Sequence, residues 1–121
     1  MTKAQNSKQY DLEDRTLEFA KQVRDFIRKL NRTLANIEDG KQLIRSSGSI
    51  GANYIEANEA LSKKDFVMRI KICRKEAKES RYWLRLLNID DKKEIEQERN
   101  VLENEVCELT HIFGAIITKS E

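Results

Sequence analysis

Apolar residues recur along this chain at steps of three and four, the spacing that places them on one side of an α-helix. In the first segment Phe19, Val23, Phe26 and Leu30 follow this rule, and similar rows continue to Phe113. The pattern predicts four helices, at about residues 12–34, 37–61, 63–87 and 91–118. Because the connections between them are short, neighbours should be antiparallel. We expect an all-α protein, with residues 1–121 forming one up-down-up-down four-helix bundle.

Polar residues that favour helix N-termini precede these segments. We expect caps from Asp11, Asn36, Ser62 and either Asp90 or Asp91. The chain contains no proline, which also favours long helices. Serine and glycine crowd residues 46–53, yet the apolar spacing continues through them, so we predict helix there, with Gly48 and Gly51 forming a notch for a neighbouring backbone.

The third helix carries two apolar stripes. Met68, Ile72, Trp83 and Leu86 lie more than about 100° from its core row, and Tyr82 lies beside them. One core cannot cover both stripes. A long helix tolerates some exposed apolar side chains, but a row with the only tryptophan favours a contact surface. We therefore predict a homo-oligomer interface formed by Met68, Ile72, Glu79, Tyr82, Trp83 and Leu86.

Charge is distributed unevenly. Residues 62–85 carry nine lysines and arginines against three acidic residues, whereas residues 86–108 carry three against eight. The net charge of +2 thus combines a local +6 with a local −5. On the third helix the cations form a strip suited to phosphate backbones. Its members are Lys64, Lys71, Arg74, Lys78, Arg81 and Arg85. The alternative is that the acidic fourth helix neutralises this strip.

Catalytic and metal chemistry find little support. Glu108 and His111 have the Glu-x-x-His spacing of di-iron bundles, but the chain has no second histidine. Cys73 lies in a core row, and with Cys107 forms no CxxC motif. We expect no enzyme, no metal and no cofactor. No apolar stretch approaches the length of a membrane span, so we expect a soluble cytoplasmic protein.

A set of polar residues lies near the middle of the chain. It comprises Asn53, Glu56, Glu59, Lys75, Glu76, Glu79 and Arg81. These side chains either cover solvated helix faces or form a hydrogen-bonded network near the notch, at a subunit contact or lining the central channel of an oligomer. The spacing does not decide between the two.

Several runs resemble one known family. They are YDLEDR at residues 10–15, RSSGSIGANYIEA at 45–57, SKKDF at 62–66 and KEAKESRYWL at 75–84. Together they resemble the four-helix-bundle proteins of the 23S rRNA intervening-sequence family, over about residues 10–113. The resemblance implies a small bacterial bundle that forms a ring-like homopentamer and has no catalytic residues. Some members are encoded inside insertions in 23S rRNA genes.

The resemblance carries structural roles onto matching positions. These are Ser49, Gly51, Asn53 and Glu56 around the notch, and Glu79, Tyr82 and Trp83 on the third helix. A more distant resemblance, of fold alone, is to the accessory variability determinant proteins of diversity-generating retroelements. Those proteins form basic pentameric barrels that bind a reverse transcriptase and nucleic acid.

Two functions fit these observations. The first is a homo-oligomeric bundle that binds RNA or DNA through the basic strip, as an accessory to a nucleic-acid enzyme such as a reverse transcriptase. The second is a protein-interaction scaffold without a nucleic-acid role. The two functions are distinguished by whether acidic side chains of the fourth helix pair with the cations of the strip.

Overall fold

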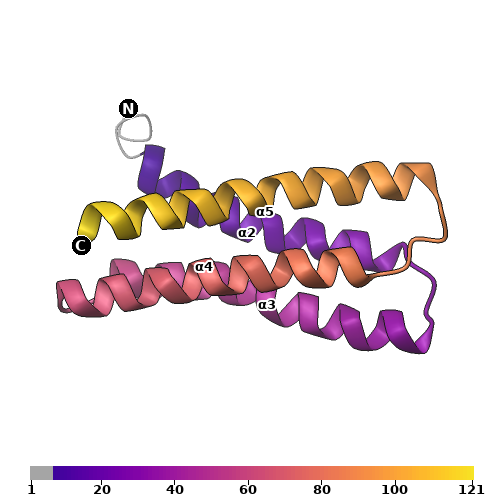
Figure 1. Ribbon diagram of the computed structural model, residues 1–121, viewed down its shortest axis with the longest axis horizontal. Coiled ribbons are helices and arrows are strands. Elements are labelled where there is room, and N and C mark those ends of the chain that lie inside the picture. The colour runs from indigo at the N-terminus through magenta and orange to yellow at the C-terminus, as the bar shows by residue number, and fades with distance from the viewer. Residues whose placement is uncertain (1–6) are drawn as a thin grey trace.

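Four long helices run along one axis in the computed structural model, which describes the backbone of residues 7–121 and the side chains of residues 12–121. They are α2 (Ser7–Arg28), α3 (Leu34–Asn58), α4 (Lys63–Leu86) and α5 (Lys93–Ser120). Consecutive helices run in opposite directions, so α2 begins and α5 ends at the same end of the bundle (Figure 1). The all-α fold with antiparallel neighbours is confirmed.

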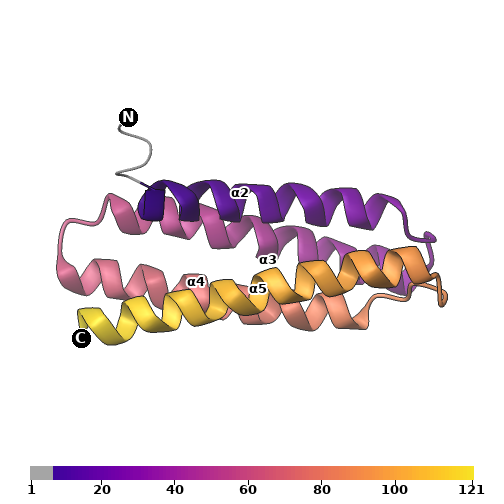
Figure 2. The same cartoon turned by 90° about the horizontal axis from the view of Figure 1, so that it is seen from above.

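Within the described residues, each helix contacts two others. Helices α2 and α4 each contact α3 and α5, so α2 and α4 occupy opposite corners of the bundle (Figure 2). The apolar rows predicted from the sequence meet between the helices. The largest fully buried apolar side chains are Phe19, Val23, Phe26, Leu43, Ile50, Ile70, Leu84, Leu102, Val106, Leu109 and Phe113.

The helix boundaries differ from the predicted ones chiefly at the first connection. Helix α2 ends at Arg28 and not near residue 34, and α3 ends at Asn58 and not near residue 61. Leu30 keeps its place in the core although it lies in the connection after α2. The helix predicted from apolar spacing was therefore too long at its C-terminal end, because Leu30 continues the apolar row although it lies in the loop.

Only one of the predicted caps is confirmed. The Ser62 hydroxyl accepts a hydrogen bond from the backbone N–H of Asp65, at 3.1 Å, and so caps α4. Helix α3 is capped by Thr33 and not by Asn36. Helix α2 begins at Ser7, so Asp11 lies inside it, and the Asp11 side chain is outside the described part.

Helix α5 also begins differently from the prediction. Its N-cap position is Lys92, which provides no side-chain hydrogen bond. Asp90 and Asp91 instead adopt positive φ angles of 55° and 57°, which a turn before the helix requires. Aspartate tolerates this left-handed conformation better than most residues.

Asn36 has a different role from the cap predicted for it. Its side-chain nitrogen donates to the carbonyls of Asn31 and Asn88, and its side-chain oxygen accepts from the Asn88 N–H. These bonds are 2.9–3.0 Å long and tie the α2–α3 connection to the α4–α5 connection. The amide thus fastens the two loops at one end of the bundle.

The serine- and glycine-rich segment is helical, as predicted. A Cβ atom added at Gly51 would lie 2.8 Å from Oγ1 and 3.2 Å from Cβ of Thr16 on α2, so only glycine fits without a shift. At Gly48 the nearest atom beyond α3 would be 3.6 Å away, in ordinary contact. The predicted notch therefore narrows to Gly51.

None of the helices among the described residues is long and apolar enough to cross a membrane. Cys73 is buried, and burial raises the pKa of its thiol to about 12. It behaves as a small apolar residue, as the sequence predicted.

Replacing Gly51 with alanine tests the contact between α2 and α3. We expect Gly51→Ala to lower the free energy of unfolding by about 1–3 kcal/mol, because the clash with Thr16 outweighs the better helix propensity of alanine. Gly114→Ala is the matched control, since a Cβ there meets nothing within 4 Å. It should raise stability by about 0.5–1 kcal/mol. Urea unfolding followed by circular dichroism measures both; equal effects would contradict the contact.

The two cysteines should differ in reactivity, because the thiolate is the reactive form. At pH 8 we expect a thiol-specific reagent to modify the half-buried Cys107 in the native protein, and Cys73 only after unfolding. Quantifying the released chromophore counts the thiols. The Cys107→Ala variant should show none in the native state, whereas modification of both cysteines without denaturant would contradict the burial of Cys73.

Candidate nucleic-acid interface

Contacts with α3 fix the rotation of α4. The hydroxyls of Ser46 and Ser80 lie 2.8 Å apart in the fully buried space between the two helices. Nearby, the Cys73 thiol donates to the Ile50 carbonyl, at 3.5 Å. Because these short side chains let the helices approach closely, this face of α4 is committed to α3. The opposite face is left to solvent and to the edge of α5.

Helix α5 holds the C-terminal end of α4. The Arg99 guanidinium donates to the carbonyls of Leu84 and Leu87, at 3.4 and 2.8 Å. Those carbonyls lack helical partners, and a cation is favourable at this end of a helix. The sequence gave no sign that Arg99 would cap α4.

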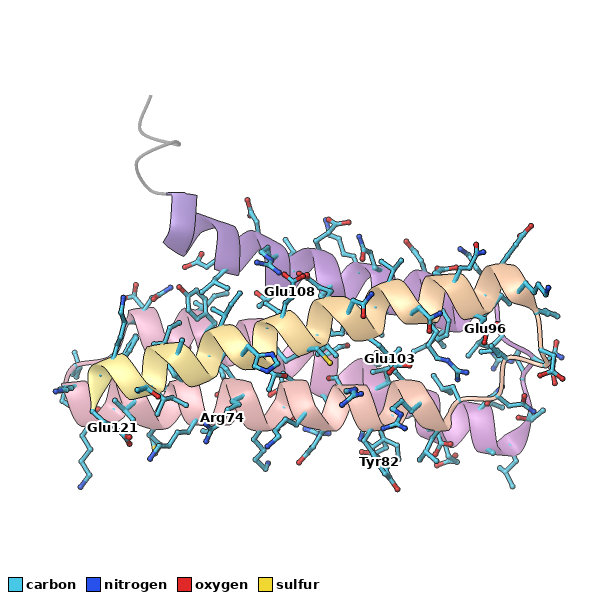
Figure 3. The ribbon with its side chains drawn as sticks, turned by 45° about the horizontal axis from the view of Figure 1, so that its top comes forward. Arg74, Tyr82, Glu96, Glu103, Glu108 and Glu121 are labelled. Atoms are coloured by element: carbon cyan, nitrogen blue, oxygen red, sulfur yellow. The ribbon has the colours of Figure 1, made fainter. Side chains whose placement is uncertain are left out.

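The predicted basic strip lies along the exposed side of α4. Lys64, Lys71, Lys78, Arg81 and Arg85 are exposed, and Arg74 is half-buried. At about 1.5 Å per residue, the strip from Lys64 to Arg85 is about 30 Å long. Figure 3 shows Arg74 on the side of α4 that faces α5, while Tyr82 projects away from the bundle. The structure therefore places these cations together on one surface.

Two of the six cations have carboxylate partners. Lys71 pairs with Glu121 at 3.1 Å, and Arg81 with Glu103 at 3.7 Å. Among the side chains of residues 12–121, no carboxylate lies within 4.0 Å of the charged nitrogens of the other four strip residues. Exposed pairs contribute only about 0–1 kcal/mol. The strip is thus mostly unneutralised within the described chain.

The acidic residues of α5 face α2 more than α4. Glu105 accepts two hydrogen bonds from Arg15, at 3.0 and 2.7 Å, and Glu108 accepts a third, at 3.1 Å. The hydrogen bonding of Arg15 to Glu105 is the main reason that the pKa of Arg15 is raised. Glu98 pairs with Lys29, the residue directly after α2, at 2.9 Å. In Figure 3, Glu108 lies on the α2 side of α5 and Glu103 on the α4 side.

The second apolar stripe of α4 is partly exposed. Met68, Tyr82 and Leu86 are 50%, 57% and 47% exposed, whereas Ile72 and Trp83 are half-buried. Trp83 packs against the core, and the ring of Tyr82 meets the Trp83 ring edge-on. The ring centroids are 5.1 Å apart and the ring planes are 78° apart. Part of the predicted interface thus also serves the interior of the bundle.

The predicted polar set divides into two groups. Arg45 of α3 lies 3.3 Å from both Glu76 and Glu79 of α4, and Lys75 lies 3.6 Å from both. Glu76 is only 5% exposed, whereas the side chains of Arg45, Glu79 and Lys75 are 38–64% exposed, so this group joins α3 and α4 at the surface of the bundle. The sequence gave no signal for Arg45, which lies outside the predicted set.

The second group surrounds Asn53. Its amide nitrogen donates to the carbonyl and the hydroxyl of Ser49, both at 2.9 Å, and its oxygen accepts from Arg69 at 3.0 Å. Arg69 was also missed by sequence reasoning. Glu56 and Glu59 are exposed and take no part in these hydrogen bonds.

A cleft of about 280 Å³ opens between α4 and α5. Lys78, Arg81, Tyr82 and Arg85 line it from α4, and Thr110 and His111 from α5. Of the pair considered for a di-iron site, Glu108 and His111 are both exposed, and Glu108 bonds to Arg15. Within the described part of the chain, no three His, Cys, Asp or Glu residues cluster as metal ligands.

The comparisons with known proteins agree with the fold. The family described as 23S rRNA-intervening sequence protein matches residues 8–115. One solved structure is a protein with unknown function from the S23 ribosomal protein family of Bacteroides thetaiotaomicron, 33% identical, with a TM-score of 0.75. The match covers 88% of this chain and 97% of that one. No curated protein matches. The chain belongs to the 23S rRNA-intervening sequence protein family.

Proposed function

We propose that this chain is a non-enzymatic nucleic-acid-binding protein that holds the backbone of RNA or DNA on the basic strip of α4. It acts as an accessory, presenting the strand to a nucleic-acid enzyme. Each cation that meets a phosphate releases a counterion from the nucleic acid, which is a large part of the affinity of such surfaces.

The observation that carries this proposal is the pairing of the charges. Arg15 of α2 pairs with the carboxylates of Glu105 and Glu108, and Lys29, just after α2, pairs with that of Glu98. Four of the six strip cations therefore have no carboxylate partner among the described side chains and can bind another anion. The scaffold alternative requires α5 to neutralise the strip, and among the described side chains only Glu103 and Glu121 form ion pairs with it.

We also propose that the protein self-associates through the apolar stripe of α4, as the homopentamers of the family suggest. Met68 and Leu86 support this, because they are about half exposed on a helix that already contacts α3 and α5 through its other apolar residues. Tyr82, also predicted for this contact, borders the cleft. Trp83 is a poor probe, because its contact with the core makes truncation destabilising.

Reversing two unpaired cations tests nucleic-acid binding. Lys78→Glu with Arg85→Glu should weaken binding of a labelled oligonucleotide at least about tenfold. It should also reduce the slope of log affinity against log salt by about two. Fluorescence anisotropy over a salt series measures both quantities.

The matched control is Lys21→Glu with Arg28→Glu on α2. It has the same residue types, the same seven-residue spacing and the same charge change, at the opposite corner of the bundle. It should leave most of the binding intact. If both double variants lose the same affinity, binding depends on the net charge of the protein and not on the strip. If the original protein does not bind at low salt, the scaffold function is favoured.

Charged substitutions on the apolar stripe test self-association. Met68→Lys with Leu86→Lys should shift the particle mass toward the monomer in light scattering, because a lysine amine is costly to bury. Leu17→Lys with Val101→Lys is the control, since these residues are similarly exposed on α2 and α5. An unchanged mass in the first variant would exclude this surface as the interface.

A further inference from the structure

The cleft between α4 and α5 gathers cations without an acidic lining. Lys78, Arg81 and Arg85 line it, and no carboxylate is among its lining residues. Arg81 contacts Glu103 through its Nε atom at 3.7 Å, which leaves the rest of the guanidinium free to donate. A single anionic group in the cleft would thus meet three positive side chains that stand within about two helical turns of one another.

His111 adds a further group from α5. Its Nδ1 atom lies 2.9 Å from the Cys107 carbonyl, and a carbonyl can only accept, so Nδ1 donates. The other ring nitrogen, Nε2, is left for a ligand. The Thr110 hydroxyl is already used, because it donates to the Val106 carbonyl at 2.7 Å.

Tyr82 provides an aromatic face at the rim of this cleft. Its ring is held edge-on by Trp83, which is itself fixed against the core, yet Tyr82 remains 57% exposed. Lys78 lies one turn before it and Arg85 one turn after it. An exposed ring between cations on a rigid helix is the combination by which proteins hold unpaired strands, with bases stacked on rings and phosphates on cations.

Duplexes do not use such a ring, because their bases are stacked inside the helix and present only their edges. Cations alone would suit a duplex as well as a single strand. The position of Tyr82 beside the cleft therefore distinguishes the two. The stacking contribution is realised only when a base is free to lie on the ring.

We infer that this cleft is a subsite for single-stranded RNA or DNA, in which a phosphate lies between Lys78, Arg81 and Arg85 and a base stacks on Tyr82. The inference rests on the proposed nucleic-acid function and narrows its substrate to unpaired strands. With Nδ1 donating to the Cys107 carbonyl, Nε2 of His111 is an acceptor in the neutral ring, so it meets a hydroxyl or an amine of the strand and not the phosphate.

Replacing Tyr82 tests the subsite. Binding of a labelled 12-nucleotide strand and of a 12-base-pair duplex is compared by anisotropy at one salt concentration. Tyr82→Ala and Tyr82→Leu should each weaken single-strand binding about 5- to 100-fold and leave duplex binding unchanged. Tyr82→Phe, which keeps the ring, should bind like the original protein.

Other outcomes separate this inference from the proposed function. If Tyr82→Ala leaves single-strand binding unchanged, or weakens strand and duplex equally, while Lys78→Glu with Arg85→Glu still abolishes binding, the subsite is wrong and the strip stands. If neither nucleic acid binds at low salt, the proposed function itself fails. If Tyr82→Ala lowers the particle mass in light scattering, Tyr82 belongs to a subunit contact and the subsite is again wrong.

Cys107 gives an independent readout because it also lines the cleft. Bound single strand should slow its modification by a thiol reagent several-fold in the original protein and not in Tyr82→Ala. Cys73 is buried in the core and serves as the internal reference for unfolding. Equal protection of Cys107 by strand and by duplex would overturn the preference for single strands.

Discussion

The close approach of α3 to its neighbours sets the geometry of the whole bundle. Small residues dominate its middle turns, so Thr16 of α2 packs closely against Gly51 while Ser46 bonds to Ser80 of α4. Serine and glycine are poor helix formers, and packing on both sides of α3 offsets that deficit. Since α4 is held by its α3-facing side, its rotation is fixed, and the surface that it shows to solvent follows from that.

The distribution of ion pairs depends on this rotation. Glu76 lies on the flank of α4 that faces α3, where it is buried beside Arg45. A buried carboxylate is costly without a partner, so this pair also holds α4 in its orientation. Among the described residues, the cations on the opposite flank have no comparably buried partner, and three of the four acidic residues of α5 that form ion pairs reach Arg15 of α2 or Lys29 just after it. A chain with a net charge of +2 thus presents one strongly basic surface.

Apolar periodicity was sufficient to predict the four helices and their cores, because burial of one face is what stabilises a helix in a bundle. It could not predict which polar residues would cap them. Asn36 has the right local context for a cap, but its amide is used by Asn88, 52 residues away in the sequence. Asp90 likewise adopts a turn conformation. Local rules fail where a distant residue or a loop uses the same side chain.

The candidate nucleic-acid interface was likewise predictable only in part. The seven-residue spacing placed the strip on one side of a helix, which needs only helical geometry. Whether α5 neutralises the basic strip depends on the rotation of α5 about its axis. Glu105 and Glu108 face α2, where both accept hydrogen bonds from Arg15, and so they do not neutralise the strip. Arg45, Arg69 and Arg99 were missed for a related reason. A long guanidinium reaches a partner on another helix, and no local pattern records that partner.

The spacing of the strip favours a polyanion over an acidic protein surface. Lys71, Lys78 and Arg85 are separated by about 10.5 Å along the helix axis, close to the screening length of about 8–10 Å at physiological salt. They therefore repel one another weakly when no ligand is bound. Arg81 lies closer, one turn from both Lys78 and Arg85, and its ion pair with Glu103 offsets the stronger repulsion at this position. A nucleic-acid strand carries a phosphate every few ångströms and can reach each cation of this row in turn, whereas exposed ion pairs between proteins match one charge with one and contribute little.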